Sequence, residues 1–325
     1  MEAFGRDYRA VREQIARVVV GHERVVEGVL TALFCAGNCL LEGVPGLGKT
    51  LLVRALGRAL SLDFRRIQFT PDLMPADITG TTIVREAPGG GKQFVFEPGP
   101  VFTQLLLADE INRATPKTQS ALLEAMAERS VTAGGQTRPL PAPFFVMATQ
   151  NPIEQEGVYP LPEAQLDRFL FKLNVGYSSR EELAEILRRT TQGHDAEVTP
   201  VLDAGKIVAY QQLVKQAAMA DHVQDYAVRL VLATHPSGEG ARFAPPQVRR
   251  FVRMGASPRA AQALVLGAKC RALVAGRPAA SIDDIRSVAP DVLRHRMILN
   301  FEGESEGATS DALIETITAT LPVEA

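Results

Sequence analysis

The sequence has little of what several classes of protein depend on. It has three cysteines among 325 residues, Cys35, Cys39 and Cys270, too few for a disulfide framework. Lys and Arg number 35 against 37 Asp and Glu, a formal charge of −2, so charge-driven binding of nucleic acid is not indicated. No apolar run approaches the roughly 18 residues of a membrane helix, and residues 1–14 lack the apolar centre of a signal peptide. These absences favour a cytoplasmic protein without a membrane span.

The cysteines do not indicate a metal site. Cys35 and Cys39 stand four residues apart, a spacing that can put two thiolates on one face of a helix. No nearby His or Cys completes a ligand set, so we interpret both as small buried side chains. The composition, with 46% hydrophobic and 22% charged residues, is that of a globular protein, and the length suggests about two domains.

In the first half of the chain, short apolar strands alternate with helices. The spacing of apolar residues predicts helix over 11–34, broken at Gly21, and over 49–60. Thr115-Pro116 supplies an N-cap and a first-turn proline for a helix that runs to about residue 128. Strands are predicted at 38–42, 66–69, 105–108 and 144–148. This alternation predicts an α/β fold with a parallel sheet flanked by helices.

Two hairpins interrupt the alternation, and the second half changes character. Strands at 81–84 and 93–96 flank the turn Pro88–Gly91, and residues 131–140 form a second hairpin around Gly134-Gly135. From about Tyr177 the sequence is helical, with helices that begin after Ser179, Ser257 and Ser281, a polar linker at 193–200 and an acidic loop at 302–310. We therefore divide the chain into an α/β core, residues 1–176, and a helical lid domain, residues 177–325.

A glycine-rich segment after the first strand carries the strongest signal. It matches the pattern G-x-x-x-x-G-K-[ST] with Gly43, Val44, Pro45, Gly46, Leu47, Gly48, Lys49 and Thr50, and we extend the nucleotide-binding segment to Leu51. The backbone N–H groups of such a loop surround phosphate oxygens, and the following helix points its positive end at them. Lys49 adds a positive charge at the β- and γ-phosphates, and the Thr50 hydroxyl is a ligand for Mg²⁺.

A second motif supplies carboxylates. The buried strand 105–108 ends in Asp109 and Glu110. Asp109 would hold the Mg²⁺ water shell, and Glu110 would polarise the water that attacks the γ-phosphate. No G-x-G-x-x-G follows a strand, which excludes a dehydrogenase fingerprint, and no Asn-Lys-x-Asp tetrad is present, which favours ATP over GTP.

Four segments in a fixed order resemble the MoxR family of AAA+ ATPases: residues 43–50, 105–114, 148–152 and 161–169. The resemblance implies that Asn151 orients the attacking water with Glu110. It implies that Arg168 is an arginine finger that reaches the ATP of a neighbouring subunit, and that Arg259 contacts phosphate bound by its own chain. The plainer interpretations are that Asn151 only forms a turn before Pro152, that Arg168 makes a surface ion pair, and that Arg259 is a solvated residue at the start of a helix.

The resemblance also assigns the adenine pocket and the hairpins. Val20, Gly21 and His22 would line adenine, although a simple helix break is the alternative. The two hairpins would face the pore of a ring and contact the client, although plain loops need no function. Arg113 is either a second interface cation or part of a salt bridge that flanks a helix.

The expected activity is Mg²⁺-dependent ATP hydrolysis by a homo-oligomer, a hexameric ring, that remodels or matures protein clients. The family also implies a partner with a von Willebrand factor A domain, which would be a separate chain here. The alternatives are the motor subunit of a metal chelatase and a DNA-translocating motor, which the near-neutral charge disfavours. A scaffold without activity is weakened because Lys49, Glu110 and Arg168 are all present.

Overall fold

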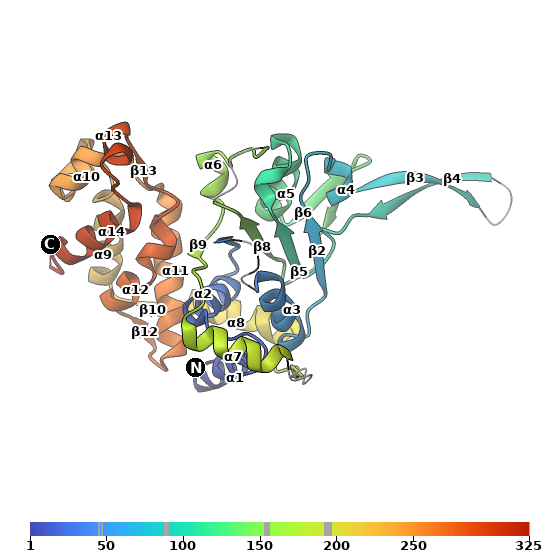
Figure 1. Cartoon of the computed structure of the whole chain (residues 1–325), viewed down its shortest axis with the longest axis horizontal. Coiled ribbons are helices and arrows are strands. Elements are labelled where there is room, and N and C mark those ends of the chain that lie inside the picture. The colour runs from blue at the N-terminus through green and yellow to red at the C-terminus, as the bar shows by residue number, and fades with distance from the viewer. Residues whose placement is uncertain (45, 47, 88–90, 153–156, 192–196, 325) are drawn as a thin grey trace.

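A five-stranded parallel sheet forms the centre of the computed structural model, which describes residues 1–44, 46, 48–87, 91–152, 157–191 and 197–324 (Figure 1). Its strands lie in the order β2-β5-β8-β1-β9. Their bounds are β1 Cys39–Glu42, β2 Phe64–Gln68, β5 Leu105–Asp109, β8 Phe145–Gln150 and β9 Phe171–Asn174. In the central register Cys39 lies opposite Met147 on one side and Phe171 on the other. The predicted α/β class is confirmed.

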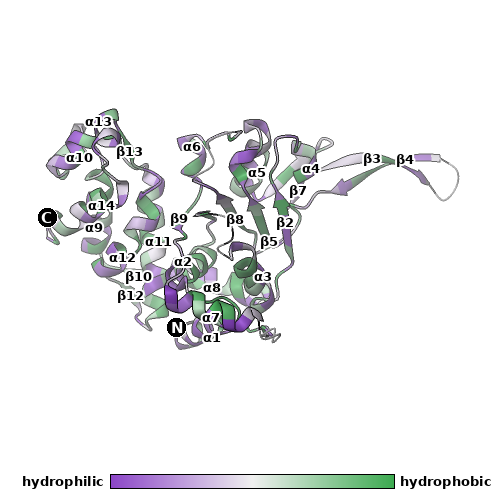
Figure 2. Cartoon of the chain, in the orientation of Figure 1, coloured by the Kyte–Doolittle hydropathy of each residue, from purple (hydrophilic) through white to green (hydrophobic). Residues whose placement is uncertain are grey.

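The strands are buried on both faces because their alternate residues pack into two separate layers. Leu41, Leu107 and Met147 point to the layer that holds helices α2 (Glu23–Phe34) and α3 (Lys49–Ala59). Leu40, Leu106 and Val146 point to the layer that holds α4 (Pro75–Thr79) and α5 (Pro116–Glu128). Figure 2 shows β5 and β8 as hydrophobic strands between these helices.

The N-terminal helix begins earlier than the sequence predicted. Helix α1 spans Glu2–Ala16, and a break at 17–22 separates it from α2. Phe4 and Tyr8 lie within α1 and are buried, although charged residues surround them in the sequence. The Phe4 ring centroid lies 5.1 Å from that of Phe34 and 5.0 Å from that of Tyr210. Phe4 is buried by Tyr210, more than 200 residues away, and this explains why the local spacing of apolar residues missed the start of α1.

Both predicted hairpins are present. Strands β3 (Gly80–Ala87) and β4 (Gly91–Pro98) pair antiparallel and project from the body of the molecule (Figure 1). The tip at 88–90 lies outside the described residues. Strands β6 (Ser130–Ala133) and β7 (Gln136–Pro139) form the second hairpin. Gly134 and Gly135 at its turn have φ values of 60° and 75°, a left-handed backbone that favours glycine.

The rest of the chain is mainly helical. It follows α6 (Glu163–Leu166) and comprises α7 Arg180–Thr191, α8 Ala204–Gln216, α9 Asp221–Leu232, α10 Pro246–Phe251, α11 Pro258–Val274, α12 Ile282–Leu293, α13 Phe301–Ser305 and α14 Ser310–Thr320. Short strands also pair there, β10 (Ala218–Met219) with β12 (Ala279–Ala280) and β11 (Val252–Met254) with β13 (Ile298–Leu299). The predicted helix starts after Ser179, Ser257 and Ser281 are confirmed. Ser179 and Ser281 each form a capping box with the acidic residue three positions on. Residues 193–196 of the predicted linker at 193–200 lie outside the described residues.

The acidic segment at 302–310 is not the loose loop that the sequence predicted, because it contains α13. The Asn300 side chain caps this helix by accepting a hydrogen bond from Gly303 N at 2.9 Å. Arg250 forms ion pairs with Glu302 and Glu306, at 2.6 and 2.5 Å. An N-cap and a cation from another helix therefore order the segment despite its glycines.

Helices α7 and α8 pack against the N-terminal helices. Arg189 Nη1 on α7 donates to Ala16 O at 2.9 Å, and Gln211 Nε2 on α8 donates to Leu33 O at 2.8 Å. Helices α9–α14 form a group beside the sheet (Figure 1), from which α12 contacts β9. The domain boundary at 176/177 stays a prediction. No helix among the described residues has both the length and the apolar character to cross a membrane.

Leu106 lies on the inner strand β5 and is fully buried in the layer that holds α4 and α5. We expect Leu106→Ala to lower the free energy of unfolding by about 2–5 kcal/mol, because the change removes apolar contacts and leaves a cavity. The control is Leu183→Ala on α7, where the side chain is 53% exposed, with an expected change within about 0.5 kcal/mol. Urea titration measures both, and equal shifts would contradict the packing described.

Candidate nucleotide-binding site

The predicted nucleotide site lies at the carboxyl edge of the sheet. Strands β1, β5 and β8 end there, so the segments that follow them meet because the strands are parallel. A cleft of about 280 Å³ is lined by Gly46, Gly48, Lys49, Thr50, Leu51, Arg66, Gln68, Asp109, Glu110 and Asn151. Gly43 and Val44 lead from β1 into the loop, and Pro45 and Leu47 lie outside the described residues. The structure thus joins the two motifs that the sequence separates by about 60 residues.

The phosphate loop turns into α3 through a left-handed backbone. Gly46 has a φ of 85° and Gly48, the N-cap of α3, a φ of 76°, so both positions favour glycine. Lys49 Nζ donates to Gly43 O at 2.7 Å. Burial lowers the pKa of Lys49, while Asp109 and Glu110 act in the opposite direction. The cleft therefore combines a helix N-terminus with one ammonium group, an arrangement that binds polyphosphate.

Asp109 is held on both carboxylate oxygens. Thr149 Oγ1 donates to Asp109 Oδ1 at 2.6 Å, and Arg66 donates to Oδ2 through Nε at 3.0 Å and Nη2 at 2.7 Å. The buried Thr149 hydroxyl also accepts from Glu110 N at 2.8 Å. Thr149 therefore fixes the two acidic residues relative to each other.

The Glu110 carboxylate is also occupied. The backbone of Glu110 has a left-handed φ of 56°, which turns the chain sharply after β5. Gln68 Nε2 donates to Glu110 Oε2 at 2.6 Å, and Arg113 Nη1 donates to the same oxygen at 3.0 Å. Arg113 thus forms a salt bridge next to the turn η1 (Ile111–Arg113). Of the two roles left open for Arg113, the structure shows this one.

Sequence reasoning missed Arg66, Gln68 and Thr149. A signal for the first two was available, since Arg66 and Gln68 alternate along β2 and therefore share one face of the sheet. Gln68 pairs in register with Asp109. That pairing depends on the strand order, which the sequence alone did not supply.

The oxygen donors of the cleft suit Mg²⁺. Thr50 and Asp109 both line it, and Mg²⁺ takes one or two protein oxygens together with water and substrate phosphates. Among the described residues, no group of three His, Cys, Asp or Glu side chains forms a metal cage. The residues therefore fit a cation that arrives with the nucleotide.

A second, narrow apolar cleft lies beside the phosphate loop. Its lining includes Val19, His22, Leu41 and Val175 as well as Gly48 and Lys49. Of the predicted adenine segment, His22 lines this cleft, and Val20 and Gly21 precede it in the same turn. Gly21 has a φ of 70°, a left-handed backbone that favours glycine, and a Cβ there would have to displace the Glu182 carboxylate of α7, which would lie 2.2 Å away.

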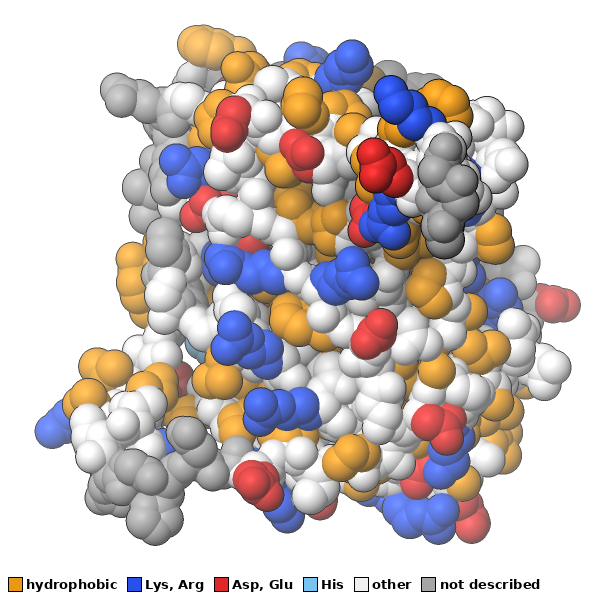
Figure 3. Space-filling view, turned by 90° about the vertical axis from the view of Figure 1, so that its right-hand side faces the viewer, with side chains coloured by type: hydrophobic (Ala, Val, Ile, Leu, Met, Phe, Trp, Pro, Cys, Tyr) orange, Lys and Arg blue, Asp and Glu red, His pale blue; other side chains and the backbone are white. Residues whose placement is uncertain are grey.

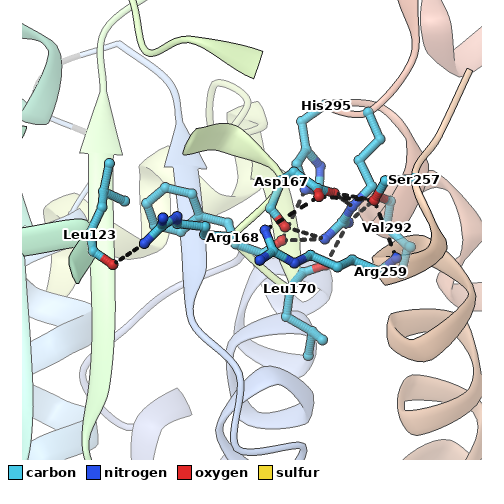
Figure 4. A network of polar contacts seen from close by, with 10 residues as sticks. Leu123, Asp167, Arg168, Leu170, Ser257, Arg259, Val292 and His295 are labelled. Carbon is cyan, nitrogen blue, oxygen red and sulfur yellow. Dashed lines mark hydrogen bonds and ion pairs between the residues drawn. The ribbon is translucent and has the colours of Figure 1, made fainter. Parts of the chain in front are cut away.

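Arg168 and Arg259 lie together at the opposite edge of the sheet. Both line a hollow with Ala36, Gly37 and Asn38, the residues that precede β1. Arg168 is exposed and its Nη1 donates to Leu123 O on α5 at 2.8 Å (Figure 4). Neither arginine lines the phosphate cleft of its own chain. Asn151, in contrast, is buried and lines that cleft beside Glu110.

The placement of Arg259 corrects one expectation. The family resemblance implied that Arg259 contacts phosphate bound by its own chain. Its Nη1 instead lies 3.5 Å from Asp167 Oδ2, beside Arg168. The reason is that α11 begins against the loop before β9, at the amino edge of the sheet, whereas the phosphate loop follows the carboxyl end of β1.

The sheet, the phosphate loop and the lid define an ATPase of the AAA class. Residues 38–171 match the family model described as "ATPase family associated with various cellular activities (AAA)", and residues 247–317 match the "AAA lid domain". The crystal structure of a protein from Cytophaga hutchinsonii that has been assigned as an ATPase superimposes with a TM-score of 0.91 at 40% identity, and the match covers 98% of this chain and 96% of that one.

Two relatives narrow the class to a family. Chaperone MoxR1 of Mycobacterium tuberculosis is 46% identical over 318 residues, which cover 96% of this chain and 81% of the relative. Protein MoxR of Methylorubrum extorquens is 34% identical over 300 residues, which cover 88% and 86%. The chain belongs to the MoxR family of AAA+ ATPases, and the resemblance drawn from its motifs is confirmed.

We expect Lys49→Ala to abolish ATP binding, because it removes the ammonium group of the phosphate cleft. The control is Arg54→Ala, which removes an exposed cation further along the same helix. Fluorescence titration with a labelled ATP analogue measures both. Affinities for the two variants within a few-fold of each other would contradict the assignment of the loop.

Proposed function

We propose that this chain hydrolyses ATP with Mg²⁺ in the cytoplasm, as a ring of identical subunits that remodels or matures protein clients. The observation that carries the proposal is the division of polar groups between the two edges of the sheet. The phosphate loop, Asp109 and Glu110 share the carboxyl edge, whereas Arg168 and Arg259 share the amino edge. A second subunit would complete the site.

The residues of the carboxyl edge would act in sequence. Thr50 and Asp109 would hold Mg²⁺, which supplies charge neutralisation at the β- and γ-phosphates when bound. Arg66 occupies Asp109 Oδ2, so it must move or share that oxygen when the cation binds. Glu110 would accept the proton of the attacking water, with Asn151 orienting that water. For this, either Glu110 Oε1 accepts from the water, or Oε2 exchanges the hydrogen bond from Gln68 for one from the water.

The arginines would act on a neighbouring subunit. Arg168 lies in the loop before β9 and cannot reach its own phosphate loop, which lies at the other end of the adjacent strand β1. Its guanidinium is exposed and makes a hydrogen bond to one backbone carbonyl. A ring, for which we propose six subunits, would place it against the γ-phosphate of the next subunit. Arg259 would face the same interface.

The hairpins would contact the client. Phe94 on β4 is 77% exposed and Val84 on β3 is 52% exposed, which leaves apolar side chains on a projecting element. Such side chains suit transient contact with a protein segment. Figure 3, which looks at the hairpin end of the molecule, shows basic and acidic side chains interspersed. This distribution favours a protein client over nucleic acid. A separate protein with a von Willebrand factor A domain would act alongside the ring as a partner.

We expect Glu110→Gln to bind ATP normally and to hydrolyse it about 10²–10⁴ times more slowly, because the amide cannot accept a proton. Glu13→Gln, an exposed acid on α1, is the control. Equilibrium binding and single-turnover hydrolysis separate the two steps. Hydrolysis at the rate of the unchanged chain would exclude Glu110 as the base.

We expect Arg168→Ala to lower kcat by about 10³–10⁵ with little change in ATP affinity, because the cation acts on the transition state of the neighbour. Mixing this chain with Glu110→Gln should restore part of the activity. The recovered sites would pair an intact Glu110 with an intact Arg168 from the next subunit. Normal hydrolysis by Arg168→Ala alone, or no recovery on mixing in assembled rings, would exclude a finger acting between subunits.

A further inference from the structure

The loop that carries Arg168 is bound by two consecutive side chains that follow α12, Arg296 and His295, of which Figure 4 labels His295. Arg296 Nη2 donates to Asp167 O at 3.1 Å and to Phe169 O at 2.7 Å. Its Nη1 donates to Leu170 O at 3.2 Å. One guanidinium thus holds the backbone carbonyls on both sides of Arg168.

His295 strengthens the same attachment. Its ring is buried, and Nε2 donates to Phe169 O at 3.1 Å. Burial, together with the charge of Arg296, lowers the pKa of His295 well below its ordinary range, so the ring stays neutral at neutral pH. The backbone of the loop is therefore fixed to the end of α12 through neutral and charged donors alike.

Asp167 connects this attachment to a second helix. Its Oδ1 accepts from Arg296 Nε at 2.8 Å and from Ser257 Oγ at 2.8 Å. Ser257 is the N-cap of α11. A single carboxylate thus joins the start of α11, the end of α12 and the residue directly before Arg168. The Arg296 side chain is only 3% exposed, and a buried ion pair of this kind often adds little stability over apolar side chains of similar volume.

The backbone around Arg168 is held more firmly than its side chain, which suggests a role for the contacts of Asp167 and Arg296. The backbone is held by several hydrogen bonds from the C-terminal helices, whereas the exposed guanidinium donates one to Leu123 O. The Arg168 side chain can therefore change rotamer, but the position of its backbone is set by the positions of α11 and α12. An error of about 1 Å in the position of a catalytic cation lowers a rate by about 10²-fold.

We propose that Asp167 and Arg296 are positioning residues for Arg168: they fix the loop to α11 and α12, so that the position of these helices sets the reach of the guanidinium toward the neighbouring subunit. The proposal rests on the proposed function of Arg168 between subunits. It assigns to a buried pair in one subunit an effect on hydrolysis in the next.

The test is the variant Arg296→Gln, with Arg294→Gln as the matched control. Arg294 is also nearly buried and also donates to a backbone carbonyl of the α/β core, Lys172 O at 2.7 Å, but it does not touch the carbonyls beside Arg168. We expect Arg296→Gln to lower kcat by about 10–100-fold, with ATP affinity and ring assembly unchanged. Arg294→Gln should change kcat less than threefold.

Mixed rings locate the defect. Adding Glu110→Gln chains to Arg296→Gln chains should restore part of the activity, because the added subunits carry a correctly placed Arg168 for the intact Glu110 next to it. If Arg296→Gln instead impaired hydrolysis at the ATP site of its own subunit, mixing would restore no activity. Sedimentation velocity on each mixture verifies that rings are present.

The possible results separate the two proposals. If mixing rescues Arg168→Ala but not Arg296→Gln, or if Arg296→Gln hydrolyses ATP normally, the positioning role is wrong and the proposed function stands. If mixing rescues neither, the finger between subunits is itself wrong. If Arg296→Gln fails to assemble, Asp167→Asn, which retains the side-chain volume, is tested in the same way. Failure of both to assemble would make the pair structural and overturn the proposal.

Discussion

The parallel direction of the five strands is the constraint on which the rest of the molecule depends. Because all strands run the same way, everything that follows a strand collects at one edge, and everything that precedes a strand collects at the other. The phosphate loop, Asp109 and Asn151 belong to the first group, and Arg168 belongs to the second. A chain built this way separates its own phosphate cleft from Arg168 and Arg259, and we infer that assembly reunites them.

Hydrogen bonds occupy the groups on which the proposed chemistry depends. Asp109 is bound by Arg66, Glu110 by Gln68, and Lys49 by the carbonyl of Gly43. A polyphosphate with its cation offers replacements for the first and third of these contacts, since it presents both anionic oxygens and a positive charge. Nucleotide binding would then rearrange the cleft without leaving charged groups unpaired.

The features that the sequence predicted are those that neighbouring residues determine. The phosphate loop, the Asp109-Glu110 pair and the caps at Ser179 and Ser281 each depend on a few consecutive positions. The start of α1 was missed because Phe4 is buried by Tyr210, far along the chain. The side on which Arg259 lies, and the presence of Arg66 at the cleft, depend on how separate elements pack, which no local pattern contains.

The central claim is that two subunits build one catalytic site. The most direct measurement is an electron cryo-microscopy structure of Glu110→Gln with ATP and Mg²⁺. The account predicts a closed ring in which the Arg168 guanidinium lies within about 3 Å, hydrogen-bond distance, of the γ-phosphate oxygens held by Lys49 of the next subunit. An ATP-bound monomer, or a ring in which Arg168 stays on Leu123 O and far from every phosphate, would contradict it.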